Sequence, residues 1–250
     1  MEESLTSVTE PYKILDWDSA FFGYKVAMLL EPSFNYNGLS NGLQKLKEEN
    51  VKLVYWSPAK RSIENGDEQK IASLGGKLVD IKTVYEISLD GKSADEFKRD
   101  ERVKEYTDTV MHPDLVGLAF ETGVYSRYKV DERIGRQKFE ELYTIWMEQS
   151  VEKKIAKAIL VTVEEKRITG MITLGERDGS GNSGLMAVDP AQRGKGLGYA
   201  LFQEMFRWFI EHGYKKIRLV TQEANVSACN FYERAGFEKV SAQPFYHFWI

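Results

Sequence analysis

The hydrophobic positions of this chain repeat with two different periods, and each change of period marks an expected element. Residues 38–50 place Leu39, Leu43 and Leu46 on one helical face, with charged residues opposite. Residues 51–56, VKLVYW, form a short apolar run that is typical of a buried strand. We therefore expect an α/β protein in which strands and helices follow one another.

The N-terminal part is predicted to form a small α/β domain, which we place at residues 1–95. In chain order we expect a strand from 13, a turn at 16–19, a strand from 24, a helix over 38–50, a strand over 51–56, a helix over 64–74 and a strand or bent strand pair over 77–89. The alternation of strands and helices favours one unit with its own core. Residues 90–101 are charged and poor in apolar side chains, which is typical of a linker.

The remainder, residues 101–250, predicts a second and larger α/β domain. The expected elements are a strand over 103–106, helices over 114–123 and 135–153, a hairpin of strands 156–163 and 168–174, a polar loop over 178–183 and final strands over 237–240 and 245–250. Within it, residues 184–237 read as strand (185–188), glycine-rich turn, long helix, strand and a second helix closed by Gly236.

The glycine-rich turn, residues 193–198 with the sequence RGKGLG, is the stretch that points most directly to a ligand. A turn of this kind leaves backbone N–H groups without partners at a helix N-terminus, where the helix dipole also favours negative charge. A dinucleotide-binding fingerprint would place its third glycine at Tyr199, and a P-loop would end in Gly-Lys-Ser/Thr, so neither fits. We expect phosphates to bind here, although the glycines by themselves are also compatible with a plain tight turn.

Two stretches carry a family resemblance. Residues 188–198, VDPAQRGKGLG, and residues 225–237, NVSACNFYERAGF, resemble the two cofactor motifs of the GNAT (Gcn5-related) N-acetyltransferases, in the right order and separated by a helix and a strand. The resemblance implies a GNAT fold, with a mixed, largely antiparallel central sheet flanked by helices, preceded by the smaller α/β domain. It also implies an acyl-CoA-dependent N-acyltransferase with acetyl-CoA as cosubstrate and no metal.

The same resemblance assigns the donor site. The loop residues would hold the pyrophosphate of acetyl-CoA, the backbone of Met186 and Val188 would pair with pantetheine, and Asn225 would hold the pantetheine arm. Asn225 is equally suited to capping the second helix. The complete set of expected cofactor-binding residues is Met186, Val188, Arg193, Gly194, Lys195, Gly196, Leu197, Gly198 and Asn225.

Two residues are candidates for catalysis by resemblance. Tyr232 occupies the motif position whose phenol protonates the departing coenzyme A thiolate; the alternative is aromatic packing against Phe231 and Phe237. Glu176 is the nearest carboxylate that offers a general base, because the strand over 185–188 has none. Its alternative is a solvated carboxylate at the end of a strand.

The acceptor is implied by a finer resemblance within the family, to a branch that acetylates nucleotide-linked amino sugars of the dTDP-4-amino-4,6-dideoxyhexose type. The resembling pieces are residues 17–23, 126–128, 221–225 and 246–249. They make Trp17, Phe21, Phe22 and His247 the expected acceptor-binding residues, with core packing as the alternative. A GNAT acting on a peptide, lysine, polyamine or antibiotic amine and a non-catalytic acyl-CoA-binding module stay open.

Composition excludes some function classes. A net charge of −4 gives no electrostatic case for nucleic acid or for an anionic membrane as partner. The one cysteine, Cys229, cannot form an internal disulfide and is expected to be a small core residue. The start of the chain lacks an apolar signal core, so we expect a cytoplasmic protein. His112 is expected at a turn and His212 at a helix C-terminus, and the oligomeric state stays open, with a homodimer among the alternatives.

Overall fold

A computed structural model describes residues 11–59 and 62–250 of the chain. Residues 1–10, in which no secretory signal was predicted, lie outside the described part. The chain divides into two compact units, one of residues up to Lys82 together with Ala242–Ile250, the other of Thr83–Ser241. This division differs from the predicted limits of 1–95 and 101–250, because two long strands, β4 and β10, each contribute residues to both units.

The first unit is built on strands in the order β1-β2-β3-β10. Strand β1 is antiparallel to β2, β2 is parallel to β3, and the end of β10 is antiparallel to β3. Buried Leu39, Leu43 and Leu46 anchor α2 to the core of this unit, as their spacing predicted. Its elements are β1 (Tyr12–Ile14), α1 (Asp16–Phe22), β2 (Lys25–Leu29), α2 (Tyr36–Glu48), β3 (Val51–Trp56) and α3 (Asp67–Ser73), with parts of β4 (Gly76–Ser88) and β10 (Glu238–Trp249).

Helix α1 replaces the turn that was predicted at residues 16–19. Asp16 and Asp18 lie in its first turn, where carboxylates stabilise the positive end of the helix dipole. Gly23 ends the helix in a left-handed conformation, with φ of 78°. The Asp and Ser residues that suggest a turn are therefore residues of a helix start.

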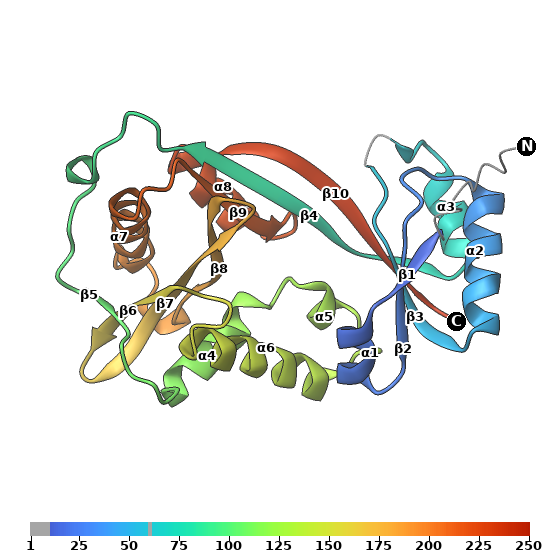
Figure 1. Ribbon diagram of the computed structural model, residues 1–250, viewed down its shortest axis with the longest axis horizontal. Coiled ribbons are helices and arrows are strands. Elements are labelled where there is room, and N and C mark those ends of the chain that lie inside the picture. The colour runs from blue at the N-terminus through green and yellow to red at the C-terminus, as the bar shows by residue number, and fades with distance from the viewer. Residues whose placement is uncertain (1–10, 60–61) are drawn as a thin grey trace, which may run out of the picture. The chain divides into compact units, whose positions relative to one another are not determined.

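The second unit contains strands in the order β9-β8-β7-β6-β5, of which β8 and β9 are parallel and the other pairs antiparallel (Figure 1). The predicted mixed, largely antiparallel sheet flanked by helices is confirmed. The elements are η2 (Ala94–Glu96), β5 (Val103–Glu105), α4 (Pro113–Thr122), α5 (Arg127–Val130), α6 (Arg136–Val151), β6 (Ala158–Glu164), β7 (Arg167–Arg177), β8 (Ser180–Val188), η3 (Pro190–Gln192), α7 (Leu197–Glu211), β9 (Lys216–Gln222) and α8 (Val226–Arg234).

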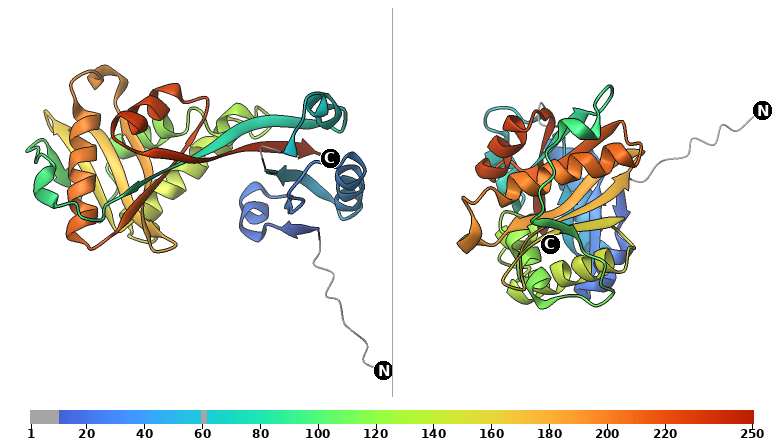
Figure 2. Two further views of the ribbon diagram at one scale, coloured as in Figure 1. Left: turned by 90° about the horizontal axis from the view of Figure 1, so that it is seen from above. Right: turned by 90° about the vertical axis from the view of Figure 1, so that its left-hand side faces the viewer.

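Helices cover both faces of β6, β7 and β8: α7 lies on one face, and α4 with α6 on the other (Figure 2). On each face of the sheet, one glycine lies where a neighbouring aromatic ring leaves no room for a side chain. A Cβ on Gly181 of β8 would lie 2.6 Å from the ring of Phe209 on α7. A Cβ on Gly123, at the end of α4, would lie 2.4 Å from the ring of Tyr143 on α6. Both helix layers therefore pack too closely for a side chain at these two positions.

Two connections differ from the sequence prediction. The predicted polar loop at 178–183 shrinks to a tight turn, because Asp178 and Gly179 both take left-handed conformations, with φ of 52° and 72°, and β8 starts at Ser180. The two strands predicted at 237–240 and 245–250 are one strand, β10, which continues through Pro244.

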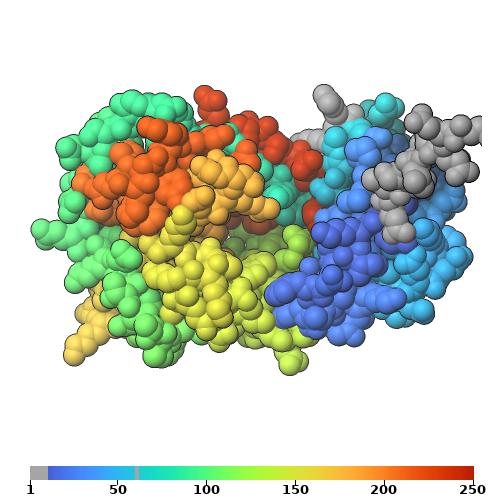
Figure 3. Space-filling model, viewed as in Figure 1, coloured from blue at the N-terminus to red at the C-terminus, as the bar shows by residue number. Residues whose placement is uncertain are grey.

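The segment predicted as a linker is packed along helix α7 instead. Phe97 stacks on Phe206, with ring centroids 4.5 Å apart. Arg207, which is 7% exposed, donates to the carbonyl oxygens of Ala94 and Phe97 at 2.6 and 3.0 Å. Figure 3 shows this segment in green against the orange α7. The segment is therefore held against α7 by these contacts, although its charged composition is typical of a linker.

No helix within the described residues is long and apolar enough to cross a membrane.

Candidate active site

The loop between β8 and α7 presents an uncapped helix start. Asp189 accepts a hydrogen bond from the amide of Ala191 at 2.9 Å, which shapes the first half of the loop. Gly194 and Gly196 have φ of 81° and 76°, in the left-handed region where a side chain would be strained. No side chain caps α7, whose N-cap is Gly196. The first-turn amides of α7 have no partner within the helix, which is the arrangement that binds phosphate.

Two basic side chains flank this helix start, and both are more than half exposed. Arg193 donates through Nε to the Val188 carbonyl oxygen at 3.2 Å and pairs through Nη2 with Glu121 at 3.0 Å. Lys195 pairs with Glu164 at 3.4 Å. An incoming phosphate would compete with these two carboxylates for the cations. The predicted loop residues thus lie together around the uncapped start of α7.

The edge of β8 opens beside this loop. The parallel ladder with β9 covers only Gly181–Ile217 to Ser183–Leu219. The pairing with β7 shifts register after Ile172, and the Thr173 hydroxyl accepts the amide of Leu185 at 2.8 Å. Beyond Ser183 the side of β8 that faced β9 is free of ladder pairs, so its backbone can bind an extended ligand as an added strand would.

The two strand residues predicted to contact the cofactor lie in this open part. Met186 and Val188 pair with Ile172 and Gly170 of β7 on one side. Their side chains pack against the hydrophobic core that α7 covers. Core packing and a backbone role are therefore compatible at these two positions.

A Cβ on Gly198 would meet nothing nearer than 3.8 Å. Gly198 is not among the glycines whose φ lies in the left-handed region. The fold therefore has no need of glycine at this helical position. A glycine that the fold does not require is expected where a ligand approaches the backbone closely.

Tyr232 of α8 lies in an aromatic cluster with residues of three other segments. Its ring is 5.7 Å from Phe202 of α7, 5.6 Å from Tyr85 of β4 and 6.2 Å from Phe237. Burial, and then the neighbouring Cys229, raise the pKa of Tyr232 to about 12. The phenol is therefore protonated at neutral pH, which is the state that a proton donor needs, while the raised pKa makes it a weaker acid than a free tyrosine.

Asn225 caps α8, because its side-chain oxygen accepts a hydrogen bond from the amide of Ala228 at 3.2 Å. The capping alternative is thus confirmed, while its role towards pantetheine stays a prediction. Cys229 is buried in the core, as expected.

The comparison with known proteins decides the family. The model of the acetyltransferase (GNAT) family matches residues 124–237, which include both motifs. Streptothricin acetyltransferase A of Bacillus subtilis (strain 168) is 30% identical over 120 residues, which are 48% of this chain and 68% of that protein. The chain belongs to the GNAT acetyltransferase family.

Two further relatives of this GNAT protein are more distant. The spore coat polysaccharide biosynthesis protein SpsD of Bacillus subtilis (strain 168) is 27% identical over 132 residues, 53% of this chain, and the match spans only 45% of SpsD. The crystal structure of a GCN5-related N-acetyltransferase from Sphaerobacter thermophilus superimposes with a TM-score of 0.57 at 20% identity, over 94% of this chain and 75% of that one. The latter likeness concerns the fold.

Glu176, the predicted general base of this GNAT protein, is engaged elsewhere. It lies at the end of β7 and pairs with Gly181, at the start of β8. Residues 193–198, which we call the phosphate loop after their predicted role, follow the other end of that strand. Its carboxylate accepts from Lys157 at 2.5 Å and from the hydroxyl of Tyr214 at 2.9 Å. These two bonds, that of Lys157 first, lower the pKa of Glu176. A lower pKa makes a weaker base, so position and chemistry both argue against the predicted role.

The predicted acceptor residues lie in the first unit. Trp17 is 48% exposed and stacks on Phe21 with ring planes only 5° apart. Phe22 is buried and contacts Phe21 edge-on. His247 of β10 is fully buried and stacks on Tyr55 at 4.8 Å. Trp17 and Phe21 therefore offer an accessible aromatic face, whereas His247 is a core side chain.

The other histidines take structural positions. His112 caps α4, because its Nδ1 accepts the amide of Asp114 at 3.2 Å. His212 closes α7 and stacks on Trp208 at 3.8 Å. Both agree with the sequence prediction. Among the residues that the structure describes, no group of three or more His, Cys, Asp or Glu side chains is arranged to hold a metal ion.

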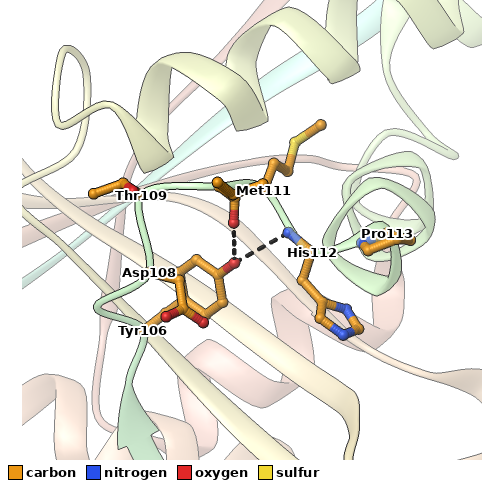
Figure 4. A pocket seen from close by; sticks show the side chains of 7 residues that line it. Tyr106, Asp108, Thr109, Met111, His112 and Pro113 are labelled. Atoms are coloured by element: carbon orange, nitrogen blue, oxygen red, sulfur yellow. Dashed lines mark hydrogen bonds between the residues drawn. The ribbon is translucent and has the colours of Figure 1, made fainter.

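A hollow of about 330 Å³ lies in the loop between β5 and α4 (Figure 4). The hydroxyl of Tyr106 donates to the carbonyl oxygen of Val110 at 2.5 Å and accepts the amide of His112 at 3.0 Å, so it holds the loop closed on itself. None of the predicted site residues is among the lining residues, which are Tyr106, Asp108, Thr109, Val110, Met111, His112 and Pro113. The hollow therefore shares no residue with the predicted site.

Arg102 was missed by sequence reasoning. It follows the charged segment taken for a linker and donates through Nη1 to the carbonyl oxygen of Lys195, in the phosphate loop, at 3.1 Å. A single arginine in a charged stretch carries no local pattern that would have singled it out.

Proposed function

We propose that the protein transfers an acetyl group from acetyl-CoA to a primary amine by direct attack in a ternary complex. The observation that carries the proposal is the uncapped start of α7, with Arg193 and Lys195 beside it, next to the open edge of β8. The first binds the pyrophosphate, and the second binds the extended pantetheine arm through its backbone.

The chemistry requires a proton donor more than a nucleophile from the protein. The lone pair of the amine forms a C–N bond to the thioester carbonyl carbon, and the electrons of the carbonyl move onto its oxygen. When the tetrahedral species collapses, the C–S bond breaks and the thiolate takes a proton, which we assign to the hydroxyl of Tyr232. The tyrosinate then regains a proton from water. The amine proton leaves to water, since Glu176 is tied to Lys157 and Tyr214.

The preferred acceptor is a nucleotide-linked amino sugar of the dTDP-4-amino-4,6-dideoxyhexose type. Support comes from the resembling stretches near both ends of the chain and from SpsD, whose name places that protein in polysaccharide biosynthesis. The exposed face of the Trp17–Phe21 stack suits a flat base or a sugar ring. The product would then feed surface polysaccharide assembly in the cytoplasm.

A second candidate acceptor is an antibiotic amine. Streptothricin acetyltransferase A, named for an antibiotic, shares 30% identity with this chain. Its match covers 48% of this chain.

An assay of free thiol release from acetyl-CoA separates the candidates. The acceptor panel contains dTDP-4-amino-4,6-dideoxygalactose, streptothricin, a polyamine and a lysine peptide, and mass spectrometry identifies the product. Turnover with the dTDP-sugar alone supports the preferred acceptor, and turnover only with streptothricin supports the second. Acetyl-CoA binding without turnover on any amine would instead indicate a non-catalytic acyl-CoA-binding module.

A further inference from the structure

Arg102 links the segment that runs along α7 to the phosphate loop. Its guanidinium makes a two-pronged bond to Asp100, with Nε–Oδ1 at 2.9 Å and Nη2–Oδ2 at 2.6 Å. The remaining nitrogen, Nη1, donates to the carbonyl oxygen of Lys195 at 3.1 Å. Asp100 is itself fixed to α7, because its amide donates to Glu204 at 2.9 Å. The Arg102 guanidinium thus connects Asp100, which is bonded to α7, with the loop carbonyl of Lys195.

The bond to Lys195 determines the direction of the next amide. A trans peptide unit is planar, so its C=O and the N–H of the following residue point in opposite directions. Because the Lys195 carbonyl is turned toward Arg102, the N–H of Gly196 is turned away from it. Gly196 is the N-cap residue of α7, where the anion-binding amides begin.

We propose that Arg102 is a positioning residue for donor binding: by holding the Lys195 carbonyl, it fixes the Gly196 amide in the direction that the donor phosphates need. This role rests on the proposed acetyl-CoA-dependent function. It is distinct from that of a cation that attracts phosphate, because the charge of Arg102 is already balanced by Asp100. A lysine cannot replace it, since one ammonium group cannot make the fork to Asp100 and reach the loop as well.

Four variants separate positioning from simple attraction, with acetyl-CoA affinity measured by isothermal titration calorimetry. We expect Arg102→Met and Arg102→Lys each to weaken binding about tenfold, the loss typical of one hydrogen bond from a charged group. Asp100→Asn should also weaken binding, because the guanidinium loses its anchor. Arg99→Met is the matched control: it removes the same charge from the same segment, but Arg99 faces Glu211 at the far end of α7. Its affinity should stay at the wild-type value.

Two results would overturn the positioning role. Wild-type affinity in Arg102→Lys would show that charge alone matters. Tighter binding in Asp100→Asn would show that Asp100 merely competes with phosphate for Arg102. Arg102 is half exposed, and circular dichroism of each variant checks that the fold is retained.

Hydrogen–deuterium exchange of the ligand-free protein tests the same contact without any donor. Arg102→Met should accelerate exchange of the Ala200 amide, which donates to the Gly196 carbonyl oxygen at 2.9 Å, and leave the amides of α8 unchanged. Unchanged exchange of the Ala200 amide would contradict the inference whatever the protein binds. If exchange accelerates but wild-type protein binds no acetyl-CoA, the proposed function fails, and the donor role of Arg102 is rejected with it.

Discussion

Tyr232 stacks on Phe202, with ring centroids 5.7 Å apart and ring planes 10° apart. The stack fixes the phenol of α8 against the helix whose N-terminus forms the phosphate loop. We expect Tyr232→Phe to lower kcat about 100-fold, the lower end of the range for a general acid, while leaving the acetyl-CoA affinity unchanged. Steady-state kinetics and calorimetry measure the two quantities.

Tyr85→Phe is the control for that variant, since it removes a hydroxyl from the same aromatic cluster. The Tyr85 hydroxyl donates to Glu233 at 2.9 Å. Its loss should leave kcat close to wild type. Full activity in Tyr232→Phe would remove this tyrosine from the mechanism and make water the proton donor.

The raised pKa of Tyr232 predicts a pH dependence. Its pKa rises from 10.0 to about 12, so the folded state favours the neutral phenol. The corresponding stability is fully present below pH 10 and disappears as the pH rises through about 12. A difference titration of wild type against Tyr232→Phe, followed by phenolate absorbance, should therefore show one tyrosine ionising near pH 12. Ionisation near pH 10 would contradict the raised pKa of Tyr232.

The Glu176–Lys157 pair predicts a variant with little effect on the reaction. Glu176→Gln removes an exposed ion pair, and kcat should remain within twofold of wild type if water receives the amine proton. The lowered pKa means that any stability from the pair is present above pH 4.5 and is lost as the pH falls through the folded-state value. A large loss of kcat, together with loss of the acidic limb of the pH–rate profile, would restore Glu176 as the base.

Gly198 and Gly181 should respond to alanine in opposite ways. Gly198→Ala has room for its methyl group and should not lower the thermal midpoint, but it should weaken acetyl-CoA binding because the methyl group occupies the approach of the phosphates. Gly181→Ala brings a methyl group within 2.6 Å of Phe209 and should cost about 1–3 kcal/mol of stability, typical of overpacking. Unchanged affinity in Gly198→Ala would show that no ligand approaches that residue.

Trp17 is the most direct test of the acceptor. Trp17→Ala should raise the KM for a nucleotide-linked amino sugar about tenfold, since stacking of a base on an aromatic ring is worth about 1–3 kcal/mol. The affinity for acetyl-CoA should not change. Tyr36→Ala, at an aromatic side chain of the same unit that is 43% exposed, is the control and should leave KM unchanged. Equal effects of the two variants would contradict a specific stacking site at Trp17.

Local patterns predicted most elements because local interactions determine them. The spacing of Leu39, Leu43 and Leu46 predicted α2, and the glycines of the phosphate loop predicted the uncapped start of α7. Strand β10 was predicted as two strands, whereas the chain continues as one strand through Pro244, a residue type that usually interrupts a strand.

The missing parts of the site depend on contacts between distant residues. Arg102 reaches Lys195 only after the charged segment packs on α7 through Phe97 and Arg207. Likewise, Glu176 could be proposed as a base from its position along the chain, but its pairing with Lys157 is visible only in three dimensions. The composition of a segment indicates the class of segment it belongs to, but it does not indicate which part of the protein the segment packs against.

Strand β10 has a consequence for the order of folding during synthesis. Its residues Tyr246–Trp249 pair with Trp56–Leu53 of β3, near the other end of the chain. Ribosomes add about 5–20 residues per second, and early domains usually fold first. Here the first unit cannot complete its sheet until the second unit has been synthesised. Strand β3 therefore keeps one edge without its partner strand until the last residues of the chain have been synthesised.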